Sequence, residues 1–242
     1  GTIIEAYKTT VKAWGKENNY AETNSGGGGV ASGDVAMAET TSLSNTKATV
    51  EGATINTVNF ALSVFHIADY NSCVNTVSVA GLGYGGGYIK NIVDAKVESN
   101  IGTNAKINAY DILIEATNST VKDWLDDEKY NVDTISGALA NVPVAQSETL
   151  IKQSATINIG NGSQLELLYS PFYEGDFILE AMNMITARDK VRLNAGGAIN
   201  WARAESVIEA KETKAMINIG NNAKLVSPKD LYLSALTKAD ID

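Results

Sequence analysis

A glycine-rich segment is the first stretch of this sequence whose residue types and spacing could do chemistry. Residues 81–86 (Gly-Leu-Gly-Tyr-Gly-Gly) satisfy the pattern G-x-G-x-x-G and follow a strand-like run at residues 77–79. Such a turn opens a dinucleotide site when a helix follows it within a β-α-β unit. Here the next residues alternate like a strand, and the surrounding chain lacks a β-α-β pattern. We therefore assign the glycines to a structural repeat and predict no cofactor-binding residue.

A run of acidic residues is the second candidate. Asp126, Asp127 and Glu128 are consecutive, and such a cluster could bind calcium or supply paired carboxylates, as in β-helical polysaccharide lyases and hydrolases. That catalysis needs further acids or an arginine on an adjacent coil. The residues available for this role are Arg188, Asp189, Arg192 and Arg203. Because the sequence gives no register that joins them, we predict a solvated acidic loop without catalytic or metal-binding residues, and a lyase or hydrolase is the alternative function.

The single histidine and the single cysteine complete the reactive side chains. His66 lies inside an apolar run, where a hydrogen-bonded structural imidazole is the expected role. Cys73 takes the position of Thr120 when residues 71–74 are aligned with residues 118–121, so the repeat asks only for a small residue there. One Cys and one His cannot form an intrachain disulfide or a Cys/His metal site.

Net charge argues against a nucleic-acid partner, and hydropathy argues against a membrane-spanning segment. The formal net charge is -9, and the 19 Lys and Arg residues are scattered, so the chain would repel phosphates. We therefore predict no nucleic-acid partner. Apolar runs stay well below the roughly 18 residues that cross a bilayer, and the first residues lack the pattern of a signal peptide.

Internal repetition is the strongest signal in the sequence. Residues 155–161 recur as residues 215–221 with a shared Asn-Ile-Gly-Asn, and residues 100–106 are a related copy. Four glycines at unequal intervals mark one phase of the repeat: Gly52, Gly102, Gly160 and Gly220. We attribute the uneven spacing to inserted loops, such as residues 169–175, whose Pro and Gly are typical of loops.

A second repeated feature is an Asp followed five residues later by an Ala. It occurs at Asp111 and Ala116, at Asp176 and Ala181, and at Asp230 and Ala235. Residues 4–14 resemble residues 114–124, so the chain is expected to start and end in the middle of a repeat. We therefore expect residues 1–242 to be one solenoid segment of a longer repeat protein.

The alternation of apolar and polar residues predicts strands, as in residues 156–159, 190–194 and 216–219. Short strands, turns rich in Gly, Asn and Asp, and only three prolines predict an all-β, right-handed parallel β-helix, or β-solenoid. With about 20 residues per coil, the chain would make about 12 coils and a rod of roughly 55 to 60 Å. Residues 4–14 and 114–124 also have heptad-like apolar spacing, which leaves an amphipathic helix open there.

The repeated unit resembles a known family. Its consensus is Gly-Gly-Ala, an alternating strand, then Ala-x-Ile-x-Ile-Gly-Asn-x-Ala-x-Leu and Asp-x-x-Leu-x-Ala, most clearly over residues 197–235 and 137–181. It resembles the repeats of the leukotoxin-like filamentous adhesins, relatives of filamentous haemagglutinin. The resemblance implies a secreted or surface-exposed bacterial protein, exported by an outer-membrane partner transporter (two-partner secretion), with adhesive and, in some members, leukotoxic activity. That family has no compact active-site motif, so no functional residue is carried over.

The predicted function is structural and adhesive rather than enzymatic. The coils would form a stiff stalk, and inserted loops with aromatic residues, at 169–175 and 124–130, would contact a protein or glycan receptor on a host or neighbouring cell. A solenoid leaves unpaired strand edges at both ends of its stack. We therefore also predict weak head-to-tail self-association.

Overall fold

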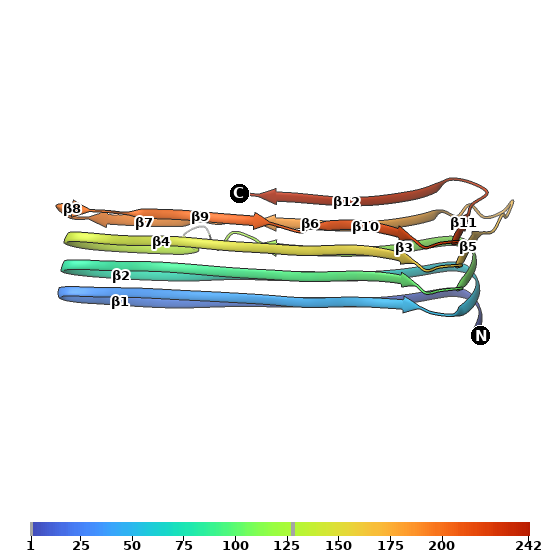
Figure 1. Cartoon of the computed structure of the whole chain (residues 1–242), viewed down its shortest axis with the longest axis horizontal. Helices are drawn as coiled ribbons and strands as arrows, with labels where there is room; N and C mark the ends of the chain where they lie inside the picture. Colours follow the sequence, from blue (N-terminus) through green and yellow to red (C-terminus); the bar gives the residue numbers. More distant parts are fainter. Residues whose placement is uncertain (1, 127–128) are drawn as a thin grey trace.

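Long parallel strands stacked on one another dominate the molecule (Figure 1). The computed structural model describes residues 2–126 and 129–242. β1 (Thr2–Val50) and β2 (Ala53–Ile101) each run out along one wall, bend, and return along a second wall. The later strands follow the same path: β3 (Lys106–Lys122), β4 (Val132–Ile159), β5 (Gln164–Leu167), β6 (Phe177–Ala187), β7 (Val191–Gly196), β8 (Ile199–Asn200), β9 (Arg203–Ala210), β10 (Lys214–Ile219), β11 (Lys224–Val226) and β12 (Leu231–Ile241).

Strand register defines the coil. Thr2 pairs with Ala53, so the first coil consists of residues 2–52. Ser154 pairs with Lys214, so a full turn at the other end of the stack is longer still. The all-β, parallel prediction is confirmed, but about 12 coils of about 20 residues is wrong. Because each coil is far longer than predicted, the chain makes four coils and begins a fifth.

The predicted rod length is wrong for the same reason. The long axis of the molecule lies along the strands and not along the stack (Figure 1). With few coils, the stack is shorter than the strands are long, and the length of the molecule is set by how far each wall extends before the chain turns back.

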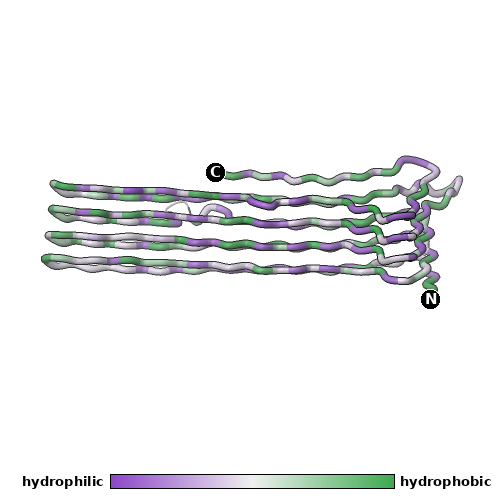
Figure 2. The backbone as a smooth tube through the Cα atoms, in the orientation of Figure 1, coloured by the Kyte–Doolittle hydropathy of each residue, from purple (hydrophilic) through white to green (hydrophobic). Residues whose placement is uncertain are grey.

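Side chains alternate between the interior of the coil and its outer surface. In β4 the buried and more exposed positions alternate over most of the strand, as a period of two requires. Figure 2 shows the corresponding alternation of hydrophobic and hydrophilic residues along the stacked strands. The two walls of each coil thus enclose one thin, continuous interior.

The apolar part of this interior lies toward the end of the coil where one coil passes to the next. Register places Ile55 beside Ile107, and Ile107 beside Leu165, and each of the three is at most 1% exposed. A second column stacks Phe60, Ile112 and Phe177 in the same way. Burial of one such side chain contributes about 1.5–3 kcal/mol, so the columns are the main source of stability.

Farther along the walls the interior becomes polar. Asn91 accepts hydrogen bonds from Thr40 at 2.6 Å and from Ser72 at 2.8 Å, and donates to Thr149 at 3.3 Å. Asn118 donates to the carbonyl of Ala95 at 2.8 Å. Burying polar groups is tolerated when they are hydrogen-bonded in this way.

The corner between coils explains the repeated glycines. The amide of Gly102 donates to the carbonyl of Val50, and the amide of Gly160 donates to that of Ile101, so the corners stack directly. A Cβ on Gly160 would lie 2.6 Å from the carbonyl carbon of Gly102. Just after the corner, Asn104, Gly162 and Asn222 have φ of 57°, 69° and 59°, a region that Gly and Asn adopt most readily.

Asparagine ladders explain the polar half of the repeated motif. Asn158 donates its side-chain amide to Asn100 at 2.7 Å, and Asn218 donates to Asn158 at 2.8 Å. Each residue occupies the same outward position in its coil, about 4.8 Å from the next. The repeated Asn therefore ties neighbouring coils together outside the apolar core.

Two insertions account for the larger changes in coil length. The first lies between β3 and β4. Asp69 pairs with Val121, and Val74 pairs with Val132 in the next coil. The sequence between Val121 and Val132 is longer than that between Asp69 and Val74, and the additional residues fall within 123–131.

The second insertion lies between β5 and β6. β3 passes from Ala109 to Ile112 while the coil above it passes from Leu167 to Phe177. The segment 169–175 accounts for the whole difference, so the loop predicted there is confirmed.

The structure corrects one secondary-structure prediction and one alignment inferred from sequence. Residues 4–14 and 114–122 are strand, so a helix there is wrong. The alignment of Ile4 with Ile114 is also wrong, because the stack places Val11 in the column of Ile114. Ala116, Ala181 and Ala235 do share one column, as the Asp and Ala spacing predicted.

Substitution of Gly160 by Ala tests the stacked corner. The added Cβ would meet backbone atoms of Gly102 and Thr103 closer than 3.0 Å, so we expect a loss of about 1–3 kcal/mol in the free energy of unfolding. Gly137→Ala is the matched control, since the space around its Cβ position is open, and its effect should stay within about 0.5 kcal/mol. Urea unfolding followed by circular dichroism measures both, and equal effects would contradict the stacked corner.

Candidate contact surface

The glycine-rich segment is part of the stack. Residues 81–86 lie inside β2, and Gly86 pairs with Val35 on one side and with Val144 on the other. Within residues 2–126 and 129–242 the structure has no helix to follow these glycines. The backbone amides that would cradle a pyrophosphate are instead used in sheet pairing.

The acidic and basic candidates are separated by burial. Asp126 has an 84% exposed side chain 3.6 Å from Lys129, while Asp189 is enclosed at 1% exposure. Asp127 and Glu128 lie outside the described residues. The three arginines each pair with a nearby acid: Arg188 with Asp240, Arg192 with Asp133, and Arg203 with Glu205. An open groove therefore does not hold Asp126 and Asp189 together.

The histidine and the cysteine are both buried. His66 is 1% exposed, its Nδ1 lies 3.2 Å from Asn118 Oδ1, and its Nε2 lies 3.9 Å from Glu17. The Cys73 thiol donates to the carbonyl of Tyr130 at 3.4 Å, and burial raises the pKa of this thiol. The alignment of Cys73 with Thr120 is wrong, because Thr120 pairs with Ala68.

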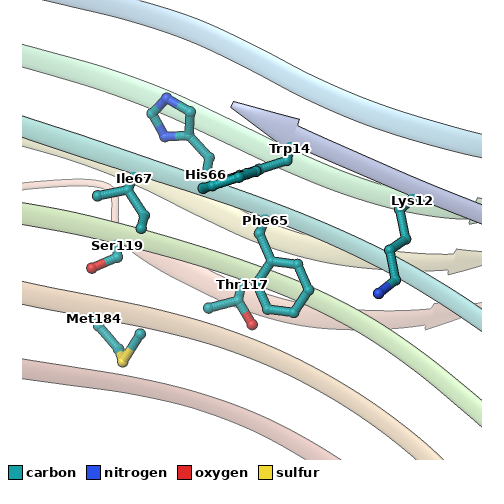
Figure 3. A pocket seen from close by; sticks show the side chains of 8 residues that line it. All are labelled: Lys12, Trp14, Phe65, His66, Ile67, Thr117, Ser119 and Met184. Carbon is teal, nitrogen blue, oxygen red and sulfur yellow. The ribbon is translucent and has the colours of Figure 1, made fainter. Parts of the chain in front are cut away.

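An apolar hollow of about 480 Å³ lies on the outer face of the wall that each coil follows first (Figure 3). Trp14, Phe65 and Thr117 come from three successive coils and share one outward column. Ile67 and Ser119 form the next outward column. We call this site the outer hollow, and its lining is Lys12, Trp14, Phe65, His66, Ile67, Thr117, Ser119 and Met184.

The composition of the outer hollow suits contact with a flat, amphipathic partner. Trp14 is 74% exposed, at an outward position where a polar residue would also be compatible with the stack. Exposed apolar patches rimmed by polar groups mark interaction sites. The aromatic faces can stack on a ring, while the hydroxyls of Thr117 and Ser119 and the cation of Lys12 can bind polar groups at its edge.

The inserted loop 169–175 presents a second exposed aromatic surface. Phe172 is 97% exposed, and Tyr169 is 70% exposed. The base of the loop is fixed, because the Tyr173 hydroxyl donates to Asn59 at 2.7 Å and its ring packs edge-on against Tyr110 at 6.2 Å. The loop therefore holds an apolar tip away from the stack.

Trp124 and Tyr130, at the two ends of the other predicted loop (124–130), lie against basic side chains of the next coil. Arg188 lies 6.0 Å above the ring of Trp124, and Arg192 lies 4.2 Å from that of Tyr130. Trp124 keeps 45% of its surface exposed. Cation–π contacts of this kind contribute about 0.5–1 kcal/mol at exposed sites, so Trp124 and Tyr130 are each anchored to the next coil.

Sequence reasoning found the two loops but missed the outer hollow. Trp14 and Phe65 are far apart in the sequence and become neighbours only once the interval between them is known to be the coil length. The signal was present, since both aromatics fall in the polar phase of an alternating strand.

Comparison with known proteins adds no relative: no protein-family model, curated protein or solved structure matches this chain. The part of the chain that the structure describes contains no helix that is long and apolar enough to span a membrane.

Replacement of Trp14 by Ala tests whether the outer hollow is free surface. Because Trp14 is 74% exposed, we expect the free energy of unfolding to change by less than about 0.5 kcal/mol. Phe60→Ala, at a position 1% exposed, should cost about 3–5 kcal/mol. Urea titration measures both variants, and a large loss for Trp14→Ala would show that this ring supports the fold.

Proposed function

We propose that this chain is a solenoid segment of a secreted or surface-exposed bacterial filamentous adhesin, of the leukotoxin-like type that its repeats resemble. It acts as a stiff support that carries contact surfaces for another cell. The observation that supports this function is the in-register parallel pairing of whole coils, with β2 paired along its length to β1 on one side and to β3 and β4 on the other.

Such pairing favours a load-bearing role over a pocket-based one. Each interior strand is hydrogen-bonded on both sides, so bending the stack would break many bonds together. Connections between parallel strands of one sheet are right-handed in nearly all proteins, so the proposal includes a right-handed coil. Export through an outer-membrane partner transporter belongs to the same proposal and rests on the resemblance of the repeats.

Contact is assigned to the two surfaces that the stack leaves exposed. The outer hollow offers Trp14 and Phe65, and the loop 169–175 offers Phe172. Large aromatic side chains dominate the binding energy of many interfaces. The receptor in this proposal is a protein or glycan on a host or neighbouring cell.

Deletion of residues 169–175 separates contact from folding. It leaves Leu168 and Asp176 between the end of β5 and the start of β6, a connection as long as residues 110–111 in the coil below. We expect an unchanged circular dichroism spectrum, because that shorter turn already occurs in the stack. Global unfolding on deletion would show that the loop belongs to the core.

Binding of the fluorescently labelled full chain to epithelial cells and leukocytes tests the contact function. We expect saturable binding that falls at least about tenfold, or about 1.4 kcal/mol, in the loop deletion or in Trp14→Ala. Val30→Ala is the control, because Val30 is 89% exposed at the far bend and outside both surfaces. Absence of saturable binding by the wild-type chain would contradict a contact function.

Sedimentation velocity over a range of concentrations tests self-association. Among residues 2–126 and 129–242, β1 pairs only with β2 and β12 pairs only with β6, so both ends of the stack present unpaired backbone groups. We expect the weight-average sedimentation coefficient to rise with concentration and to resist added salt, since backbone pairing is not screened as charge pairs are. A strictly monomeric profile at high concentration would contradict this prediction.

A further inference from the structure

Lys122, the last residue of β3, is enclosed inside the coil. Its side chain has no exposed surface, and its Nζ lies 2.9 Å from Oδ1 of Asp189, whose side chain is 1% exposed. Lysine is almost never fully buried unless it is paired. The pair joins two coils, because Lys122 lies in the third coil and Asp189 follows β6 in the fourth.

Mostly apolar groups surround this pair. Lys122 pairs in register with Ala187 of the coil above, and Tyr70 occupies the equivalent position in the coil below, after Asp69 and Val121. Thr120 donates to Gln153 across the interior at 2.6 Å, which sets Lys122 opposite Ile151. Ala187, Tyr70 and Ile151 are all at most 1% exposed, so bulk water has little access.

The contact is as short as a salt bridge, but it lacks the geometry of a hydrogen bond. Over residues 2–126 and 129–242, neither Lys122 Nζ nor Asp189 Oδ1 has a hydrogen-bond partner of normal geometry, despite their 2.9 Å separation. Ser206 donates to the other oxygen, Oδ2, at 2.7 Å and thereby fixes the carboxyl group. Unsatisfied buried polar atoms are costly, and a covalent bond between these two groups would remove that cost.

Burial also favours the reactive form of the amine. It lowers the pKa of Lys122, against the opposing effect of the Asp189 charge. The neutral amine is the nucleophilic form of lysine. Transfer of one proton across the 2.9 Å contact gives that amine and a carboxylic acid without any outside reagent.

We propose that Lys122 and Asp189 form an intramolecular isopeptide bond that covalently joins the third and fourth coils. The lone pair of the neutral Nζ attacks Cγ of the protonated carboxyl group, and a C–N bond forms. The C–O bond to the hydroxyl then breaks, and this hydroxyl leaves with one amine proton as water. The second amine proton stays on the amide nitrogen, so the reaction has no oxidant, reductant or co-substrate.

The position explains how the condensation is driven forward and what it does. Two groups held in contact react as if at very high concentration, and the released water leaves an apolar interior. The bond lies where residues 123–131 separate β3 from β4, both of which pair with β2. It would therefore lock the stack at the point where the wall is least continuous.

Intact mass spectrometry of the denatured wild-type full chain tests the bond. After the folded protein has been incubated at neutral pH, we expect a mass lower than that of the sequence by one water molecule. Tryptic mapping should show a branched peptide containing Lys122 and Asp189, because trypsin does not cleave after an acylated lysine. A folded wild-type chain with the full sequence mass and unlinked peptides overturns the proposal, and this measurement depends on no variant.

Three substitutions locate the bond. Lys122→Arg should restore the full sequence mass, whereas Asp189→Asn should still form the amide, with loss of ammonia instead of water. Lys152→Arg is the matched control, because Lys152 pairs with Glu212 at 3.1 Å on the surface and its removal should leave the water loss unchanged. Persistence of the water loss in Lys122→Arg would place the modification elsewhere and overturn the assignment.

Discussion

Backbone hydrogen bonding between successive coils is the constraint on which the rest of the structure depends. Because β1, β2 and the later strands pair in register, each side chain of a paired strand stacks on its equivalent about 4.8 Å away. The corner glycines meet backbone to backbone, and Asn100, Asn158 and Asn218 form a ladder for the same reason. A substitution in one coil therefore alters the contacts of that coil with the coils above and below it.

The interior of the coil changes from apolar to polar along the strand. Apolar columns such as Ile55, Ile107 and Leu165 supply most of the stability, while polar groups such as Asn91 are linked across both walls and between coils. A slip of one residue would turn the polar groups outward and leave their partners unpaired, so they specify the register. Lys122 and Asp189 are the extreme case, an amine and a carboxyl group in contact inside the coil.

Outside the walls the constraint relaxes. An insertion between two strands lengthens one coil and leaves the pairing of its neighbours intact, as the segment 169–175 and residues 123–131 show. The same outer surface can also present apolar columns, because a side chain that points outward is not required for packing. A repetitive support and variable contact surfaces are thus compatible in one architecture, which is the physical basis of the function proposed for this chain.

The sequence by itself determined the strands, the parallel stack and the corner positions. Alternation indicates strands, and the repeats that contain Gly160 and Gly220 become stacked equivalents when the register is known. It could not determine the coil length, because a period of two is the same in a short strand and in a long one. Only the tertiary structure placed Trp14 beside Phe65 and Lys122 against Asp189, since these pairs depend on the register of long coils and on the crossing of two walls.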